Sequence, residues 1–396
     1  MILFVQTEFN RITMLLTHNF LLFNLLITCD IMKILELHYS TAAAGAERLV
    51  IDLSNELSRN NELVLCTTDD DSILENSYYK NEISARIKYI NLKCKSGLGV
   101  KSIWRILKII KEEKPDIVHS HANLITLFLP AILLPGIRYF HTIHNLAERC
   151  LINKNLKFIY KWFYKKKVQP VTISQLCLDS YKKLYNMDNA INIVNGRSRL
   201  QQTTDYDKVT IELNELRIHD DDKIFVHVAR CAKAKNQKLL VDTFNRFLNE
   251  GNHGILILIG TAYDSEENIH ILNNAQKGIY WLGAKNNVGD YLLQADFFVL
   301  SSLFEGLPIS LLEAISCGVI PICTPAGGIP DVINSESNGY VSKSFDADDF
   351  YYTLKRAFDD EKYFNRIHLE EYFENNFSMR HCAEGYFNAF SHNDTE

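Results

Sequence analysis

Short apolar runs alternate with longer amphipathic segments along most of this chain. Apolar runs of about 4–8 residues are typical of buried strands, and apolar residues three or four positions apart indicate helices. Strands that alternate with helices predict parallel βαβ units and open doubly wound sheets of the α/β class. The strands are expected at residues 33–38, 62–67, 87–90, 116–119, 139–142, 169–173, 224–229, 254–259, 278–282, 297–300 and 319–323.

The strand pattern falls into two series, which predicts two domains. The first series ends near Asn195-Gly196, and the polar stretch 197–208 precedes the second. The simplest architecture is a pair of Rossmann-like domains, residues 32–198 and 199–376, that face each other across a cleft. Ligands of open α/β sheets bind beyond the carboxyl ends of the strands, so we expect the functional site in that cleft.

Residues 1–31 precede the first predicted strand and match none of the expected elements. Their apolar stretch is interrupted by His18, Asn19 and Asn24, whereas a membrane-spanning helix needs ~20 largely apolar residues. A signal peptide would need a small-residue cleavage site, which this segment lacks. We favour a non-native or dispensable extension, with Met32 as the start; a weak membrane anchor and a signal peptide are the alternatives.

Composition narrows the class of protein. The chain is 47% hydrophobic and 23% charged, as in ordinary globular proteins. Its formal net charge of −6 disfavours a nucleic-acid-binding protein. The nine cysteines form no C-x-x-C pair, which argues against a disulfide framework and a structural zinc site. The sequence therefore predicts a protein of the reducing cytoplasm.

The first candidate for chemistry is the segment 305–313, which follows the expected strand 297–300. Pro308 suits the first turn of a helix, which puts Glu305 in a loop above the sheet and Glu313 within the helix. Free amides at a helix start favour an anionic or hydroxyl-rich ligand. From spacing alone, a helix-capping Glu305 and a solvent-facing Glu313 are the simpler explanation.

Two cations, Arg230 and Lys235, follow the strand expected at 224–229. Arginine binds a diphosphate bidentately and lysine binds it as a point charge. Isolated residues of this kind are usually surface cations, but Glu305 is expected at the same edge of the same sheet. Gly45 lies among alanines after the first strand, where small residues let a ligand approach the backbone.

Histidines mark the ends of two further strands, in His119-Ser120-His121 and in the segment 141–145. No carboxylate or thiol accompanies them at the sequence spacing of a metal site, so we expect no metal. Histidine at the edge of a cleft is better interpreted as a hydrogen-bonding group for a sugar or a phosphate.

Together these motifs resemble family 4 of the retaining nucleotide-sugar glycosyltransferases, which have the GT-B fold, and the type that builds bacterial surface polysaccharides. The resemblance runs from about Met32 to Phe390. The segments that carry it are Gly45-Ala46-Glu47, residues 114–121 and 142–145, Thr172-Ile173-Ser174, Asn195-Gly196, Arg230 with Lys235, residues 295–301 and 305–314, and Gly318-Val319-Ile320-Pro321.

The resemblance implies a role for each matching residue. The first domain would bind the acceptor, with a C-terminal helix at about 377–396 packing back on it, and the second would bind the donor. Glu305 and His144 would contact the transferred sugar, while Arg230 and Lys235 neutralise the donor diphosphate; these four form the implied catalytic set. The implied donor-binding residues are Gly45, Gly306, Leu307, Pro308, Ile309 and, at the ribose, Glu313.

The implied reaction moves a hexose from a UDP- or GDP-sugar to a lipid-linked or oligosaccharide acceptor of capsule, O-antigen or lipopolysaccharide, without a metal or other cofactor. A sugar-nucleotide epimerase of similar fold and an inactive glycosyltransferase-like binding subunit are the alternatives. Some positions depart from the family pattern: Ala44, Ala229 and Asn236 replace common glycines, and Arg197 replaces an apolar residue.

Basic and aromatic residues interleave in the segment 154–167. Such a helix suits the anionic cytoplasmic face of the inner membrane, although a domain helix with core aromatics and solvated lysines explains the pattern equally well. Because the family commonly acts on lipid-linked acceptors, we favour peripheral membrane contact. The residues expected to make it are Lys154, Lys157, Lys161, Trp162, Lys165, Lys166 and Lys167.

Overall fold

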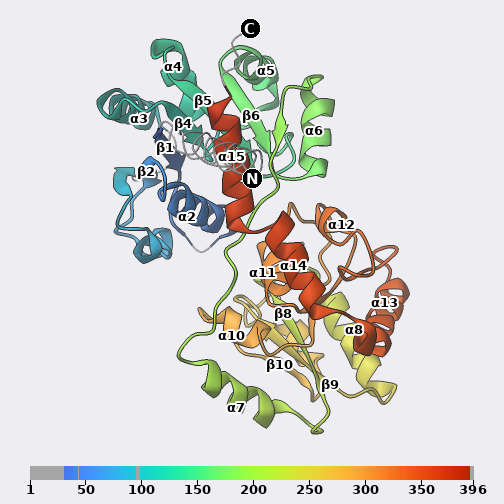
Figure 1. Ribbon diagram of the computed structural model, residues 1–396. Helices are drawn as coiled ribbons and strands as arrows, with labels where there is room; N and C mark the ends of the chain where they lie inside the picture. The colour runs from blue at the N-terminus through green and yellow to red at the C-terminus, as the bar shows by residue number, and fades with distance from the viewer. Residues whose placement is uncertain (1–30, 43, 95–98, 393–396) are drawn as a thin grey trace, which may run out of the picture.

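The computed structural model describes residues 31–42, 44–94 and 99–392, so the segment 1–31 lies outside it except for Ile31. Two parallel sheets form two domains (Figure 1). The strand order is β3-β2-β1-β4-β5-β6-β7 in the first sheet and β10-β9-β8-β11-β12-β13 in the second. The predicted α/β class with two doubly wound sheets is therefore confirmed.

The expected strands are all present, with ends shifted by a few residues; β3 runs furthest beyond its expected end. Two edge strands, β7 and β13, were not predicted, because two residues each carry no readable pattern. The strands are β1 (Lys33–His38), β2 (Glu62–Asp69), β3 (Lys88–Cys94), β4 (Ile117–Ser120), β5 (Arg138–Ile143), β6 (Val168–Thr172), β7 (Ile191–Asn192), β8 (Lys223–Val228), β9 (Gly254–Ile259), β10 (Ile279–Trp281), β11 (Phe297–Leu300), β12 (Ile320–Cys323) and β13 (Tyr340–Val341).

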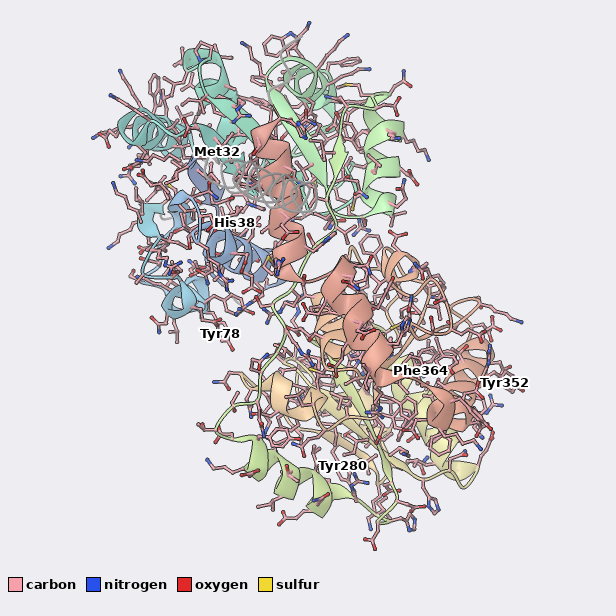
Figure 2. The ribbon with its side chains drawn as sticks, in the orientation of Figure 1. Met32, His38, Tyr78, Tyr280, Tyr352 and Phe364 are labelled. Atoms are coloured by element: carbon pink, nitrogen blue, oxygen red, sulfur yellow. The ribbon has the colours of Figure 1, made fainter. Side chains whose placement is uncertain are left out.

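Each sheet has a core cluster on both of its faces. Helices surround each sheet (Figure 2). In the first domain they are α2 (Gly45–Leu57), α3 (Val100–Glu113), α4 (Ile125–Leu133), α5 (Lys157–Lys166), α6 (Gln175–Tyr185) and α15 (Met379–Ser391). In the second they are α7 (Tyr206–Leu216), α8 (Gln237–Asn249), α9 (Ile269–Asn273), α10 (Val288–Leu292), α11 (Ile309–Ser316), α12 (Ile329–Val332), α13 (Ala347–Asp360) and α14 (Arg366–Asn376).

Strand β9 shows why the strands of these sheets are continuous apolar runs in the sequence. Its residues Gly254 to Ile259 are all buried. Ile255 and Ile257 pack into one core cluster, whereas Leu256 and Leu258 pack into another on the opposite face. Side chains alternate between the faces of a strand, so a parallel strand covered on both sides must be apolar at every position.

The chain passes between the domains twice, and the two crossings lie side by side. Arg197 N donates to Phe377 O at 2.8 Å, and Met379 N donates to Arg197 O at 3.0 Å. A Cβ built on Gly196 would lie 2.6 Å from Cys382 Cβ, so this crossing requires glycine. Helix α15, which begins at the second crossing, packs against α2 and contributes to the core of the first domain (Figure 1).

Candidate active site

Each sheet reverses its strand order at one point, between β1 and β4 in the first domain and between β8 and β11 in the second. Ligands of doubly wound folds bind at the carboxyl ends of strands at such a point. The predicted site residues lie at these ends: Arg230 and Lys235 follow β8, Glu305 follows β11 and His144 follows β5.

Lys235 and Glu305 form an ion pair in the second domain. Lys235 Nζ lies 2.6 Å and 2.8 Å from the two carboxylate oxygens of Glu305. Ser302 Oγ donates to Glu305 Oε1 at 2.6 Å, and Glu305 is only 7% exposed. Helix α11 has no side-chain cap, so the capping interpretation of Glu305 is wrong. The carboxylate is instead held by Lys235, which leaves little net charge on this pair.

Arg230 is a cation that the second domain leaves unpaired at this edge. It is exposed, and within the described residues its guanidinium makes no hydrogen bond or ion pair. Asn236, the departure noted beside Lys235, has φ of +51°, a left-handed conformation that asparagine tolerates and that glycine would adopt freely. The loop geometry is therefore retained without the glycine.

The loop that carries Glu305 is held by a second loop. Gly327 has φ of +59°, and a Cβ there would lie 1.9 Å from Glu305 O. Gly328 N donates to Gly306 O at 2.7 Å. Sequence analysis missed this glycine pair, although two adjacent glycines after a strand are a turn signal.

The donor-binding residues that follow Glu305 occupy different environments. Pro308 is the residue just before α11 rather than within its first turn, so the helix starts at Ile309. Leu307 is buried in the core of the second domain, so its side chain is not available to a ligand.

Glu313 in α11 is not solvent-facing, contrary to the simpler interpretation of the sequence. Its Oε1 accepts a hydrogen bond from Arg197 Nε at 2.8 Å. The other end of the Arg197 guanidinium pairs with Asp52 on α2. Arg197 is 6% exposed, so it forms a buried link between the two domains. Apart from the departure from the family pattern at Arg197, nothing in the sequence pointed to this link.

Residues predicted from the first domain meet those of the second. A Cβ built on Gly45, at the start of α2, would lie 3.5 Å from Ile309 Cγ1. A Cβ on Gly306 would lie 3.5 Å from the backbone oxygen of His144. The structure thus brings Gly45 and His144 against the loop and helix start that carry the predicted donor-binding residues.

Behind His144 lies a buried network that the sequence did not predict. Glu36 on β1 is the register partner of His119 on β4. Glu36 Oε1 lies 3.1 Å from His119 Nδ1, and Glu36 Oε2 lies 3.0 Å from His121 Nε2. His121 Nδ1 lies 2.9 Å from His144 Nε2. The expectation that no carboxylate accompanies the histidines is therefore wrong; a charged residue inside an apolar strand was the available signal.

The ligand atoms of Glu36, His119 and His121 lie within 4.8 Å of one another, a spacing that could hold a metal ion. Every one of these atoms already takes part in a hydrogen bond within the network. We therefore interpret the cluster as a hydrogen-bond network.

Burial and proximity set the charge states of this network. Burial opposes ionisation of Glu36, but attraction to His119 and hydrogen bonds from both histidines outweigh it and lower the pKa of Glu36 to about 2. Burial lowers the pKa of His121 to about 3. Burial and the neighbouring His121 hold the pKa of His144 well below its usual value. At neutral pH, Glu36 is a carboxylate and both His121 and His144 are neutral.

Two family models match consecutive parts of the chain: "Glycosyltransferase Family 4" over residues 43–195 and "Glycosyl transferases group 1" over residues 209–375. Between them they span most of the sequence. The chain belongs to glycosyltransferase family 4.

Named relatives and a solved structure agree with this assignment. The glycosyltransferase is 27% identical to an Escherichia coli UDP-Gal:alpha-D-GlcNAc-diphosphoundecaprenol alpha-1,3-galactosyltransferase, over 66% of this chain and 71% of that protein. It is 26% identical to the Staphylococcus aureus capsular polysaccharide biosynthesis glycosyltransferase CapH, over 79% and 85%. Anabaena HepE in complex with UDP-glucose superposes with a TM-score of 0.72 at 15% identity, covering 91% of this chain and 99% of that one. The GT-B fold of the glycosyltransferase is thereby shown.

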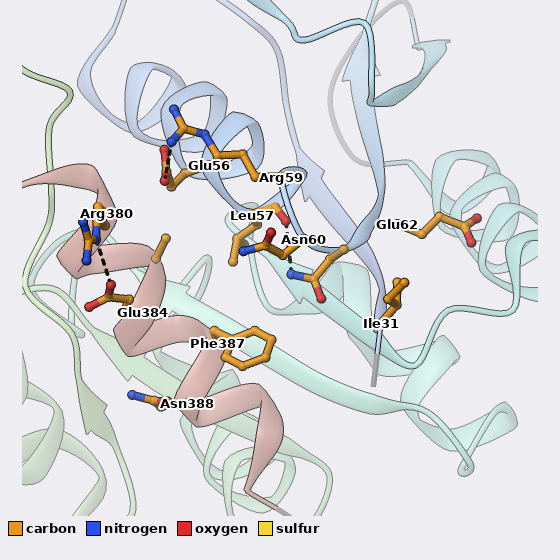
Figure 3. A pocket seen from close by; sticks show the side chains of 12 residues that line it. Ile31, Glu56, Leu57, Arg59, Asn60, Glu62, Arg380, Glu384, Phe387 and Asn388 are labelled. Atoms are coloured by element: carbon orange, nitrogen blue, oxygen red, sulfur yellow. Dashed lines mark hydrogen bonds and ion pairs between the residues drawn. The ribbon is translucent and has the colours of Figure 1, made fainter. Parts of the chain in front are cut away.

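A separate pocket of ≈1140 Å³ lies between α2 and α15 (Figure 3). Its lining includes Asn60, Glu62, Arg380 and Phe387, and none of the predicted site residues. Residues 60–62 immediately precede β2 or begin it, so this pocket is at the amino end of the sheet. It is not the candidate active site of the glycosyltransferase.

Helix α5, with Lys154 just before it, has two different faces. Tyr160 and Phe163 are buried in the domain core, as the core-helix interpretation expected. Phe158 and Trp162 are 79% and 48% exposed, and the six lysines of the segment make no ion pair with any described residue. Across the described ranges, the glycosyltransferase has no helix that is long and apolar enough to span a membrane.

Proposed function

We propose that this glycosyltransferase moves a hexose from a UDP-sugar to a lipid-linked or glycan acceptor during synthesis of a cell-surface polysaccharide, with retention of anomeric configuration and without a metal. The E. coli relative is named for UDP-galactose and a diphosphoundecaprenol-linked sugar, and the Anabaena neighbour was solved with UDP-glucose. Both support a uridine donor over the guanosine alternative.

One observation carries the proposal: His144 and Gly45 of one domain lie against the Glu305–Ile309 loop of the other. Arg230 follows β8, the strand next to β11, at the same edge of that sheet. Transfer breaks the bond between the anomeric carbon and the diphosphate oxygen, so negative charge develops on the leaving nucleoside diphosphate. The Arg230 guanidinium and the amides at the start of α11 stabilise that charge in the transition state. Lys235 has one N–H donor beyond the two that bind Glu305.

We further propose that the first domain docks on the anionic membrane surface that holds the acceptor. Helices α3, α4 and α5 lie at the end of this domain away from the second domain (Figure 1). Exposed apolar side chains occur on each of them: Trp104 is 57% exposed, Ile132 52% and Phe158 79%. Such side chains can insert at the headgroup boundary while neighbouring lysines attract anionic lipids.

The test begins with thermal unfolding in the presence of UDP, GDP, ADP and CMP. A ligand at 100 times its dissociation constant stabilises the folded state by ~2.7 kcal/mol. If the donor is a UDP-sugar, UDP should therefore raise the Tm, and GDP, ADP and CMP should not. Radiolabelled UDP-hexoses are then supplied with a lipid diphosphate-linked sugar and EDTA. Transfer to the lipid fraction supports the proposal.

Three other results would contradict parts of it. Stabilisation by GDP alone would reject the uridine donor, and restoration of activity by Mg²⁺ or Mn²⁺ after chelation would reject the metal-free mechanism. Conversion of the UDP-sugar into an epimer without transfer would favour the epimerase alternative. Nucleotide binding with neither reaction would favour the inactive binding subunit.

A further inference from the structure

We infer that Glu36 and His121 are positioning residues that hold His144 as the neutral imidazole with its proton on Nε2, so that His144 Nδ1 is a hydrogen-bond acceptor for the donor sugar. This inference rests on the proposed function, because it assigns a hydrogen-bonding role to His144 in the cleft. To that role it adds two positioning residues, Glu36 and His121, and it states which atom donates in each hydrogen bond.

The donors and acceptors of this network can be assigned starting from Glu36. An ionised carboxylate only accepts hydrogen bonds, and Glu36 is fully buried between two histidine rings. Its Oε2 lies 3.0 Å from His121 Nε2, so this ring nitrogen must carry the proton and donate. His119 Nδ1 donates to the same carboxylate in the same way.

The proton on His121 Nε2 then decides the roles of the next two ring nitrogens. A neutral imidazole carries one proton, and in His121 it is on Nε2. Its Nδ1 is therefore an acceptor, and the His144 Nε2 that lies 2.9 Å away must donate to it. The two ring planes are inclined by 28° and their centroids lie 5.1 Å apart, so the rings meet nearly edge to edge along this hydrogen bond. His144 is neutral as well, so its remaining nitrogen, Nδ1, has no proton.

His144 Nδ1 is the end of this chain and is open to a ligand. No described residue forms a hydrogen bond with it, and it is not among the fully enclosed polar atoms without a partner. The backbone of His144 adjoins the Gly306 loop of the second domain. An acceptor at this place selects a sugar hydroxyl or amide N–H, and it disfavours a group that only accepts, such as the carboxylate of a uronic acid.

The other arm of the network supplies a matched control. His119 Nε2 lies 2.8 Å from Thr142 Oγ1, which lies 3.0 Å from the hydroxyl of Tyr386 on α15. This arm is as buried as the first but ends in the core of the domain. Thr142→Val removes a buried hydrogen bond without touching the connection between Glu36 and His144.

The direct test is the protonation state of His144 in wild-type protein. Two-dimensional ¹H–¹⁵N spectra of histidine-labelled enzyme distinguish protonated from unprotonated ring nitrogens, with His144→Asn used to assign the signals. We expect His144 to be protonated at Nε2 alone at pH 7. A proton on Nδ1, or on both nitrogens, would overturn the inference whatever the activity of the enzyme.

The kinetic test compares His121→Phe with Thr142→Val. Loss of the restraint on His144 should lower kcat/KM for the UDP-hexose by roughly 10- to 100-fold, as expected when a contacting group is slightly misplaced. Thr142→Val should stay within about threefold of wild type. His121→Gln should recover much of the activity, because its amide can donate to Glu36 and accept from His144.

Equal losses in His121→Phe and Thr142→Val, or none in His121→Phe, would contradict the positioning role. UDP lacks the sugar that His144 is proposed to contact, so UDP should stabilise every variant as it does the wild type. If wild type neither binds UDP nor transfers sugar, the proposed function fails, while the spectra still report on His144.

Discussion

The two sheet edges that face each other across the cleft are built from different chemistry. At the first domain's edge, Glu36 and a set of buried histidines satisfy one another through directional hydrogen bonds. At the second domain's edge, Arg230 is exposed and unpaired within the described structure, and Lys235 is partly exposed beside Glu305. One side is suited to orient a ligand and the other to neutralise it.

This difference shows how one cleft can serve both parts of a nucleotide sugar. A histidine ring nitrogen has a fixed role as donor or acceptor where it is shielded from water and its partners cannot rotate. His121 is buried in this way. A diphosphate is better bound by charges that keep access to water until the ligand arrives. The predictions below separate these two roles, starting from the largest expected effect.

Removing the Arg230 side chain should have the largest effect on turnover. Arg230→Ala is expected to lower kcat by ~10²–10³-fold with no loss of thermal stability, because it removes a donor to the leaving diphosphate. Lys233→Ala, in the same loop and also exposed, should have little effect. The measurement is turnover of the cognate UDP-sugar together with the Tm of each variant.

Lys235 should behave differently from Arg230. Lys235→Ala leaves the buried Glu305 carboxylate without its cation, so both turnover and the Tm should fall. If Arg230→Ala and Lys235→Ala both turn over at the wild-type rate, the second domain's edge is not the phosphate site.

Breaking the Arg197 link between the domains should have the next largest effect. Arg197→Met leaves Asp52 and Glu313 buried without this partner and should lower the free energy of unfolding by roughly 3 kcal/mol. Arg199→Met is the matched control, because Arg199 pairs with Glu370 at the surface and should cost under about 1 kcal/mol. Urea denaturation of both variants tests this. Similar losses would show that the buried link does not stabilise the domain arrangement.

Acid should weaken the first domain before the second. Burial lowers the pKa of His121 to about 3 and that of His141 to about 4, and it holds the pKa of His144 well below its usual value. In the second domain, His227 is lowered in the same way, to about 4. Below pH 6.5 the unfolded chain binds protons that these native histidines do not. Each therefore removes up to about 1.4 kcal/mol of stability per pH unit until its folded pKa is reached.

Glu36 acts in the same direction at lower pH. Its folded pKa of about 2 lies below its usual 4.5, so its contribution is complete above pH 4.5 and is lost as the pH falls toward 2. Hydrogen exchange with mass spectrometry at pH 7 and pH 5 should show loss of protection first in β1, β4 and β5. Earlier loss in β8 and β11 would contradict this order.

The smallest effect concerns the surface of the first domain. Anionic vesicles should bind the protein, and binding should weaken as salt rises, because each lysine near the headgroups adds ~1 kcal/mol that salt screens. Changing Lys165, Lys166 and Lys167 to Glu should abolish co-sedimentation. Trp162→Ala should weaken it without changing its salt dependence. Binding that is equal in all variants and independent of salt would assign this face to another partner.

Sequence alone located most of the fold and much of the candidate site. Strands 254–259 and 297–300 were predicted at their observed bounds, because a strand buried on both faces is a continuous apolar run. Strand 33–38 was also predicted at its observed bounds, although Glu36 interrupts its apolar run. The Glu305 loop and the cations after β8 were found because the carboxyl ends of parallel strands share one edge. Edge strands β7 and β13 were missed, since two residues cannot show a period.

The tertiary structure alone decided which polar groups are partners. Glu36 and His119 are 83 positions apart, and only the register of β1 beside β4 brings them together. Arg197 and Glu313 are separated by 116 positions and two domains. Local pattern determines which residues are strand, helix or loop, because backbone geometry depends on near neighbours. The protonation of His144 and the neutralisation of Lys235 depend on contacts between distant segments, and only the packed fold fixes those.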